Sequence, residues 1–290
     1  MISRFKIVLA TAAILILTVT VLGGFYMYRK VFKPAYDMDK QAAELLGANL
    51  PGPDLGQKKH TEAMERIAQG EIIAARHILE TVIEIHPDSS IAGEAQRAIG
   101  EINLDKIFSK SPMPGKLQYT VKQGDSLAGI AKRNRTTIAY IQQVNGLFST
   151  LIHPGNRLIL YPFEFDFTVD LKNKALSLWE NGKFVKMYPI IDFKRPLRGS
   201  FPSRTRISDK RAWLDGKSIR LTDRKAPLAE MWLQTPSRLG TPEVIFCRVP
   251  TPGSDSPGSE LIAYGVFLNQ SDIAELSTLT RVGTQVTIVD

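Results

Sequence analysis

The chain has 290 residues, of which 43% are hydrophobic and 23% are charged, and its formal net charge is +8. This length exceeds one ordinary domain, and the ordinary apolar content excludes a wholly disordered chain and a polytopic membrane protein. The single cysteine, Cys247, excludes an intramolecular disulfide framework and a multi-thiolate metal site. None of the four histidines lies beyond residue 153, so any chemistry in the rest of the chain proceeds without imidazole.

An uncharged apolar run at residues 7–28 lies close to the N-terminus. A helix of this length reaches about 33 Å, enough to cross the hydrocarbon core of a bilayer. The run exceeds the apolar part of a signal peptide and lacks a small-residue cleavage site at its end, which favours an uncleaved anchor over a cleaved signal peptide. We therefore expect residues 1–33 to form a cytoplasmic stub and a single transmembrane anchor. Basic residues flank the run on both sides, so they do not set its orientation.

A linker is expected at residues 34–60 because the run 51–56 breaks any helix, and helical patterning follows at 61–110. This part resembles the second half of a tetratricopeptide repeat, with a small residue in the helix before it. The matching positions are Gly70, Ala75, Leu79, Val82 and Pro87, with Ala63 as the small residue. One repeat and a fragment are too few for a solenoid, which favours a helical hairpin that acts as a spacer or dimer contact over a peptide-binding groove.

A short stiff linker at 111–117 precedes a segment, 118–162, whose pattern predicts strand, helix, helix and strand. The first strand covers Tyr119 to Val121, and a turn follows it with Asp125 or Ser126 as the N-cap of the first helix. The second helix ends near Asn145 and Gly146, as expected for a glycine that terminates a helix.

This segment closely resembles the lysin motif (LysM) family. The residues that match are Tyr119, Val121, Gly124, Asp125, Ser126, Leu127, Ile130, Ala131, Ile141, Asn145, Ile152, Pro154, Gly155, Leu158 and Leu160. In that family a shallow groove between two loops binds glycan that contains N-acetylglucosamine. The resemblance implies a groove here formed by Gly124, Asp125, Ser126, Leu127, Ile152, His153, Pro154 and Gly155. The alternative for each residue, and for His153 above all, is that it only builds a turn.

From Phe163 onward apolar and polar residues alternate around turns at 173–174 and 181–182, which predicts β-hairpins of a sandwich or barrel. We therefore expect residues 163–290 to be mostly β. The fold class of the whole chain is then multidomain α+β, with a transmembrane helix, a helical hairpin, the β-α-α-β LysM segment and this C-terminal domain.

The C-terminal segment resembles the catalytic domain of L,D-transpeptidases of the ErfK type through short matches spread over residues 169–288. In that family a Ser/Thr-His-Gly-Cys box, followed by an arginine, supplies the nucleophile, and a second histidine lies upstream. The corresponding positions here are Phe246, Tyr264, Val266 and Leu268. These side chains offer no nucleophile and no base, so we expect no catalytic residue and interpret the domain as a pseudoenzyme.

The alternative is an active peptidoglycan L,D-transpeptidase or carboxypeptidase with displaced catalytic residues, in which Cys247 would be the nucleophile. Without a histidine in the domain this thiol stays mostly protonated at neutral pH, although Arg248 would lower its pKa. The apolar run 244–247 favours a packed core residue instead. No motif for a metal or cofactor is present in the sequence, so none is expected.

Eleven basic and three acidic residues lie between residues 194 and 225, a net charge of +8 that equals that of the whole chain. This concentration predicts an anion-binding face for peptide-stem carboxylates, acidic wall polymers or lipid phosphates. Its candidate residues are Arg195, Arg198, Arg204 and Arg206. The alternative is a solvated loop. No recognition motif for nucleic acid accompanies the charge, so no nucleic-acid partner is expected.

Taken together, the sequence predicts a protein held in the bacterial inner membrane by one N-terminal helix, with its soluble domains on the periplasmic side. The LysM segment is expected to grip the glycan strands of peptidoglycan, and the C-terminal domain to act as a catalytically inactive scaffold. A third hypothesis makes this domain a second binding module, for peptide stems or an anionic wall polymer.

Overall fold

The computed structural model describes residues 54–87, 89–195, 201–214, 217–221, 225–237, 243–249 and 265–290, together with positions 30, 33 and 223. The apolar run at 7–28 lies outside these residues. Within the described ranges, no helix combines the length and the apolar character that a membrane crossing requires.

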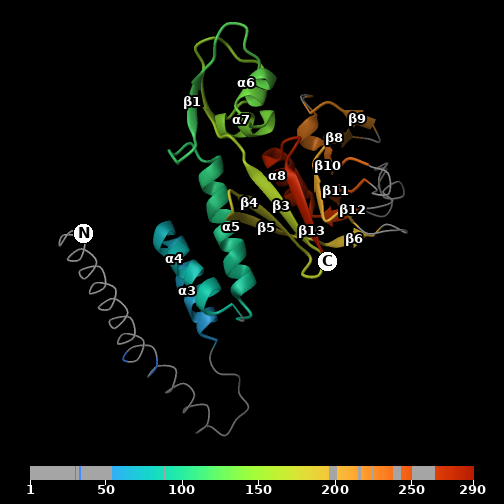
Figure 1. Cartoon of the computed structure of the whole chain (residues 1–290). Coiled ribbons are helices and arrows are strands. Elements are labelled where there is room, and N and C mark those ends of the chain that lie inside the picture. The colour runs from blue at the N-terminus through green and yellow to red at the C-terminus, as the bar shows by residue number, and fades with distance from the viewer. Residues whose placement is uncertain are drawn as a thin grey trace, which may run out of the picture.

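Three helices open the described chain: α3 (Leu55–Ala68), α4 (Ile72–Ile85) and α5 (Ala92–Phe108) (Figure 1). The α3–α4 pair packs around Ala63, Leu79 and Val82, which are fully buried. Helix α3 begins ahead of the predicted start at residue 61, because the Asp54 carboxylate accepts a hydrogen bond from the backbone N–H of Gln57 at 3.2 Å and caps the helix. The tetratricopeptide resemblance of these helices stays a prediction.

Helix α5 lies against strand β5 (Lys183–Pro189) of the C-terminal region (Figure 1). The amide of Asn103 donates to the backbone oxygens of Val185 at 2.9 Å and Phe184 at 3.3 Å, and its oxygen accepts from Arg76 Nη1 on α4 at 2.7 Å. The expectation of a helical spacer is therefore corrected for α5. Its buried residues Ala95 and Ile99 pack with α3 and α4, whereas Leu104 and Ile107 belong to the core that extends into the C-terminal sheets.

The LysM segment folds in the predicted order. Its elements are β1 (Leu117–Thr120), α6 (Leu127–Arg133), α7 (Ile138–Asn145) and β2 (Arg157–Leu160), and the two strands pair antiparallel. Its own small core contains Leu127, Ile130, Ile141 and Leu160, all nearly or fully buried. Gly146 ends α7 in the left-handed conformation at φ 67°, as a glycine C-cap does.

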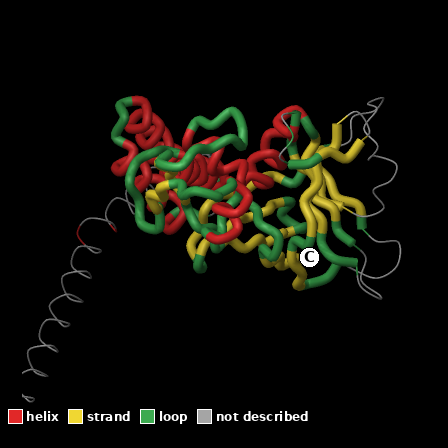
Figure 2. The backbone as a smooth tube through the Cα atoms, turned by 90° about the horizontal axis from the view of Figure 1, so that it is seen from above, coloured by secondary structure: helices red, strands yellow, loops and turns green. Residues whose placement is uncertain are grey.

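Two sheets form the C-terminal region. The five-stranded sheet has the order β5-β4-β3-β13-β7, with β3 (Phe165–Asp170), β4 (Ala175–Glu180), β7 (Arg204–Arg206) and β13 (Gln285–Val289). The six-stranded sheet has the order β6-β12-β11-β10-β8-β9, with β6 (Asp192–Lys194), β8 (Asp209–Leu214), β9 (Lys217–Ile219), β10 (Glu230–Gln234), β11 (Ile245–Arg248) and β12 (Gly265–Leu268). Helix α8 (Gln270–Leu279) packs on β10 and β11. Seen from above, the N-terminal helices gather on one side of the molecule and the strands of the six-stranded sheet on the other (Figure 2).

One apolar core runs through α5, the LysM segment and the C-terminal sheets. Tyr140 of α7 is fully buried in it, and its hydroxyl donates to the backbone oxygen of Ile107 on α5 at 2.9 Å. The Tyr140 ring also meets the edge of Phe163, with the ring centroids 5.0 Å apart. The LysM segment is therefore fixed against the β-rich region by buried side chains.

Candidate functional site

The two loops of the predicted glycan groove lie side by side. The backbone N–H of Val121 donates to Asn156 O at 2.9 Å, and that of Gly155 donates to Val121 O at 2.8 Å. Gly124 and Gly155 adopt backbone φ values of +83° and +90°. A residue with a Cβ atom adopts such values only under strain. No atom lies within 4 Å of the point where either residue would carry a Cβ. Both glycines therefore present open backbone to an approaching ligand.

Asp125 organises the first loop. Its carboxylate accepts from the Tyr119 hydroxyl at 2.8 Å and from the Lys122 backbone N–H at 2.8 Å, and it also pairs with Arg133. These contacts, the Lys122 N–H first among them, lower the pKa of Asp125. Both carboxylate oxygens of Asp125 therefore have partners within the LysM segment, and these contacts stabilise the turn.

The next two predicted groove residues also support the fold. The Ser126 hydroxyl accepts from the backbone N–H of Gly129 at 3.2 Å and caps α6. Leu127 is 1% exposed, so its side chain belongs to the core and only its backbone is available to a ligand.

In the second loop, His153 and Pro154 are exposed, while Ile152 is half-buried against the LysM core. The His153 backbone N–H donates to Asn156 Oδ1 at 2.8 Å, which fixes the turn and leaves the imidazole outside it. Two further residues of this loop were missed by the sequence analysis. Phe148 is fully exposed, and Leu151 is 70% exposed. Two large apolar residues after a helix-ending glycine were the signal that could have revealed them.

The positions of the family's catalytic residues come together in the C-terminal region. Strands β11 and β12 are parallel, and Phe246 is paired in register with Val266. Both side chains are fully buried in the apolar core, as is Leu268. Tyr264 lies outside the described residues. The two positions that the sequence resemblance aligns with the upstream histidine and the cysteine therefore lie on neighbouring strands, and both hold apolar side chains.

Cys247 belongs to a different cluster from Phe246, its neighbour in the chain. It is 1% exposed and packs with Trp232 and Phe267. Burial raises the pKa of the Cys247 thiol to about 12, and Glu230 adds to the rise. The thiol is therefore protonated at neutral pH and has the character of a packed core residue.

The described candidates for the anion-binding face lie at the edges of two sheets. Arg195 follows β6, the edge of the six-stranded sheet, and pairs with Asp290 at 2.9 Å. Arg204 and Arg206 are exposed on β7, the edge of the five-stranded sheet. Arg198 lies outside the described residues. Within the described part of the chain, no group of three or more His, Cys, Asp or Glu residues could hold a metal ion.

A family profile described as "LysM domain" matches residues 119–160. The chain is 50% identical over 42 residues to a probable N-acetylmuramidase of Lactococcus lactis subsp. cremoris. It is 55% identical over 40 residues to the N-acetylmuramoyl-L-alanine amidase sle1 of Staphylococcus haemolyticus. Each match covers 14% of this chain and only 10% to 12% of the relative. The likeness to both relatives is thus confined to a short part of each chain.

Solved L,D-transpeptidases share weak structural similarity with this chain. An L,D-transpeptidase of Enterococcus faecium aligns at a TM-score of 0.27 and 17% identity, over 43% of this chain and 49% of its own. One from Mycobacterium smegmatis aligns at a TM-score of 0.29 and 12% identity, over 47% and 64%.

Proposed function

We propose, since residues 119–160 form a LysM domain, that this chain binds the glycan strands of peptidoglycan through the loops 121–127 and 152–156. The observation that carries the proposal is the pairing of Val121 with Gly155 and Asn156, which brings the two loops together. Open space at Gly124 and Gly155 lets a sugar ring approach the backbone closely. The exposed Phe148 adds an apolar surface on which a sugar face can stack.

The C-terminal region, in this proposal, is a catalytically inactive scaffold or binding module with an L,D-transpeptidase-like fold. Phe246 and Val266 support it, because they occupy the family's histidine and cysteine positions and offer neither base nor nucleophile. The protonated, buried thiol of Cys247 supports it as well. The rival function, an active L,D-transpeptidase or carboxypeptidase, requires a nucleophile that these described residues do not supply.

The proposal also places the protein in the bacterial inner membrane, with residues 7–28 as a single-pass anchor and the folded part on the periplasmic side. The apolar run supports the assignment of an anchor. The LysM domain supports the periplasmic side of the membrane, because glycan strands lie outside the cytoplasm. Anchor and LysM domain together would tether the membrane to the wall.

The test is co-sedimentation of the full chain with insoluble peptidoglycan, in detergent. Deleting the LysM domain is unsuitable because Tyr140 belongs to the shared core. We therefore choose Gly124→Gln, which puts a side chain into the groove, and Gly70→Gln as its control. Gly70 has a similar φ of +80° and equally open surroundings, but it lies in the α3–α4 turn. The two changes thus impose similar backbone strain.

Loss of sedimentation in Gly124→Gln alone supports the glycan-binding groove, and equal retention in both variants contradicts it. Muropeptides are analysed from the same tubes. An unaltered muropeptide profile agrees with an inactive C-terminal domain. New cross-links or trimmed stems would instead establish the enzyme.

A further inference from the structure

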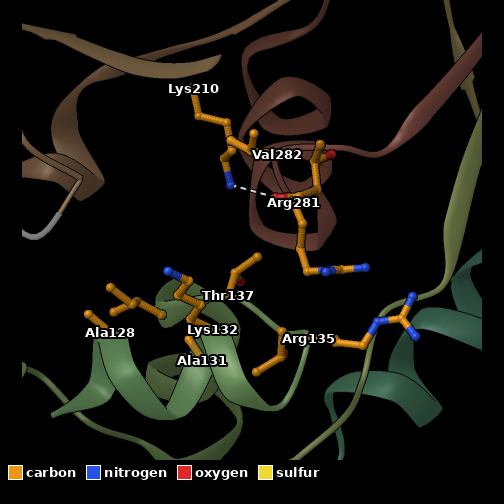
Figure 3. A pocket seen from close by; sticks show the side chains of 11 residues that line it. Ala128, Ala131, Lys132, Arg135, Thr137, Lys210, Arg281 and Val282 are labelled. Atoms are coloured by element: carbon orange, nitrogen blue, oxygen red, sulfur yellow. Dashed lines mark hydrogen bonds between the residues drawn. The ribbon is translucent and has the colours of Figure 1, made fainter. Parts of the chain in front are cut away.

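A cavity of about 280 Å³ lies where the LysM domain meets the C-terminal region (Figure 3). One wall consists of α6 and the turn that leads to α7, and the other of Lys210 on β8 and the residues that follow α8. Thr137, the N-cap of α7, donates its hydroxyl to Thr278 O at 2.5 Å and so joins the two walls. Neither part forms this cavity alone.

All charged residues in the lining are basic. Lys132 and Arg135 come from the LysM side, and Lys210 and Arg281 from the C-terminal side, while none of the described lining residues is acidic (Figure 3). Glu164 neutralises Arg135 through a contact of 2.7 Å. The other three cations form no ion pair with any carboxylate of the described chain. The cavity therefore carries an uncompensated positive charge.

Several hydrogen-bond donors at the cavity remain unused. The Lys210 ammonium group donates to the backbone oxygens of Ser277 and Thr280, the latter at 2.7 Å, and a lysine has three protons to donate. Arg281 uses Nη2 on Phe163 O at 2.8 Å, but its buried Nε has no hydrogen-bond partner among the described residues. The same holds for the hydroxyl of Thr136, which is only 5% exposed.

Burial lowers the pKa of Lys210 to about 7 and also lowers the pKa of Arg281, to which the neighbouring Arg135 contributes. Burial is the main cause of both shifts, and at Arg281 the nearby Glu164 carboxylate partly opposes it. Buried donors without partners are unfavourable, so an anion that accepted their hydrogen bonds would stabilise this site.

We propose that the cavity binds a carboxylate of the peptide stems carried by the peptidoglycan strand. This inference rests on the proposed function. Arg281 Nε, the third Lys210 proton and the Thr136 hydroxyl supply donors for the carboxylate oxygens. The groove loop 121–127 leads directly into α6, and the next residue, Ala128, lines the cavity. A strand held in the groove brings its stems toward the cavity.

A carboxylate is preferred to a phosphate because the ligand proposed for the LysM domain carries carboxylates on its peptide stems, next to the glycan held in the groove.

The experiment measures the affinity of the full chain, in detergent, for three soluble ligands. These are an uncharged N-acetylglucosamine oligomer, a disaccharide-tetrapeptide muropeptide and the same muropeptide with its carboxylates amidated. We expect the muropeptide to bind about tenfold more tightly than its amidated form. Lys210→Met and Lys132→Glu should remove most of this advantage and leave the affinity for the oligomer unchanged. Lys132 is exposed, so its variant keeps the test valid if Lys210→Met fails to fold. Lys172→Gln, at an exposed turn lysine away from the cavity, is the control.

The three ligands separate the inference from the proposed function. If the oligomer binds but amidation has no effect, or if the advantage persists in both variants, the carboxylate site is wrong while glycan binding stands. If neither the oligomer nor any muropeptide binds, the proposed function fails. Acetate and inorganic phosphate are added as competitors. Displacement of the muropeptide by phosphate at lower concentration than by acetate would overturn the carboxylate assignment in favour of a phosphate-bearing polymer.

Discussion

Lys186 on β5 lies 2.8 Å from Glu275 on α8, and Glu101 on α5 approaches the same ammonium group to 2.8 Å. The Lys186 side chain is only 9% exposed, so one buried cation joins three elements that are far apart in the sequence. The two carboxylates differ in their surroundings, because the side chain of Glu275 is 29% exposed and that of Glu101 is 63% exposed.

This asymmetry predicts unequal effects of the same substitution. Glu275→Gln should lower the free energy of unfolding by about 2 kcal/mol, because it leaves the buried ammonium group with a single, largely exposed partner. Glu101→Gln should lower it by less than about 1 kcal/mol, because solvent screens that pair. Urea denaturation of the two variants measures the difference. Equal losses would show that Lys186 does not depend on its buried partner.

Cys247 should behave as a core residue. A thiol reagent added to the native chain at pH 7 to 9 should label it very slowly, because the thiol is buried and burial raises its pKa to about 12. Labelling in denaturant should be complete and fast. Cys247→Ala should leave the muropeptide profile unchanged, with a modest loss of stability from the missing sulfur atom. Rapid labelling of the native chain, with a pH dependence that gives a thiol pKa near neutrality, would instead support Cys247 as a nucleophile.

Phe148 is expected to contribute to glycan binding without contributing to stability. Phe148→Ser should weaken the affinity for an N-acetylglucosamine oligomer several-fold, as the loss of one aromatic contact does. The melting temperature should stay the same, because the ring is fully exposed and supports no packing. Ile73→Ser, at an 89% exposed residue of α4, is the matched control and should leave the affinity unchanged. An unaltered affinity in Phe148→Ser would remove the ring from the groove.

Lys210 should make stability depend on pH. Its pKa is about 7 in the folded chain and about 10.4 in the unfolded one, so the unfolded chain binds more protons between these values. The free energy of unfolding therefore rises with pH above 7, with a contribution from Lys210 of up to about 1.4 kcal/mol per pH unit. Below pH 7 both states hold the proton and this contribution is constant.

Urea denaturation at pH 6, 7, 8 and 9 checks the slope, and Lys210→Met should lack the rise above pH 7. Lys172→Met, an exposed control, should keep the rise. Identical slopes in the Lys210 variant and the unaltered chain would show that Lys210 keeps an ordinary pKa.

The LysM elements could be predicted from the sequence because their signals are local. Apolar spacing identified α6 and α7, Ser126 and Gly146 marked helix ends, and the glycines marked the loops. The mixed helix and sheet architecture and the β-rich C-terminal region followed from periodicity in the same way. The two loops that the resemblance assigns to a glycan groove lie side by side, and their role in binding stays a prediction.

The packing between these parts could not be predicted, because it depends on contacts between residues distant in the chain. Thr137 and Thr278 are 141 positions apart, and no local pattern announces their hydrogen bond. The same is true of Asn103 on α5, whose hydrogen bonds to the backbone of β5 fix this helix against the C-terminal sheet. Lys210 was seen only as one charge of a basic segment, since its place in the cavity depends on a neighbouring domain.

The burial of Tyr140 in the core that α5, α7 and the β-rich region share has a mechanical consequence. A pull on a bound glycan strand would not be absorbed by a slack connection behind the LysM domain. The force would be transmitted directly to the aromatic contacts around Tyr140, so the LysM domain and the sheets would rotate together as one rigid body. The direction of the strand would then fix the direction in which the C-terminal region faces the wall.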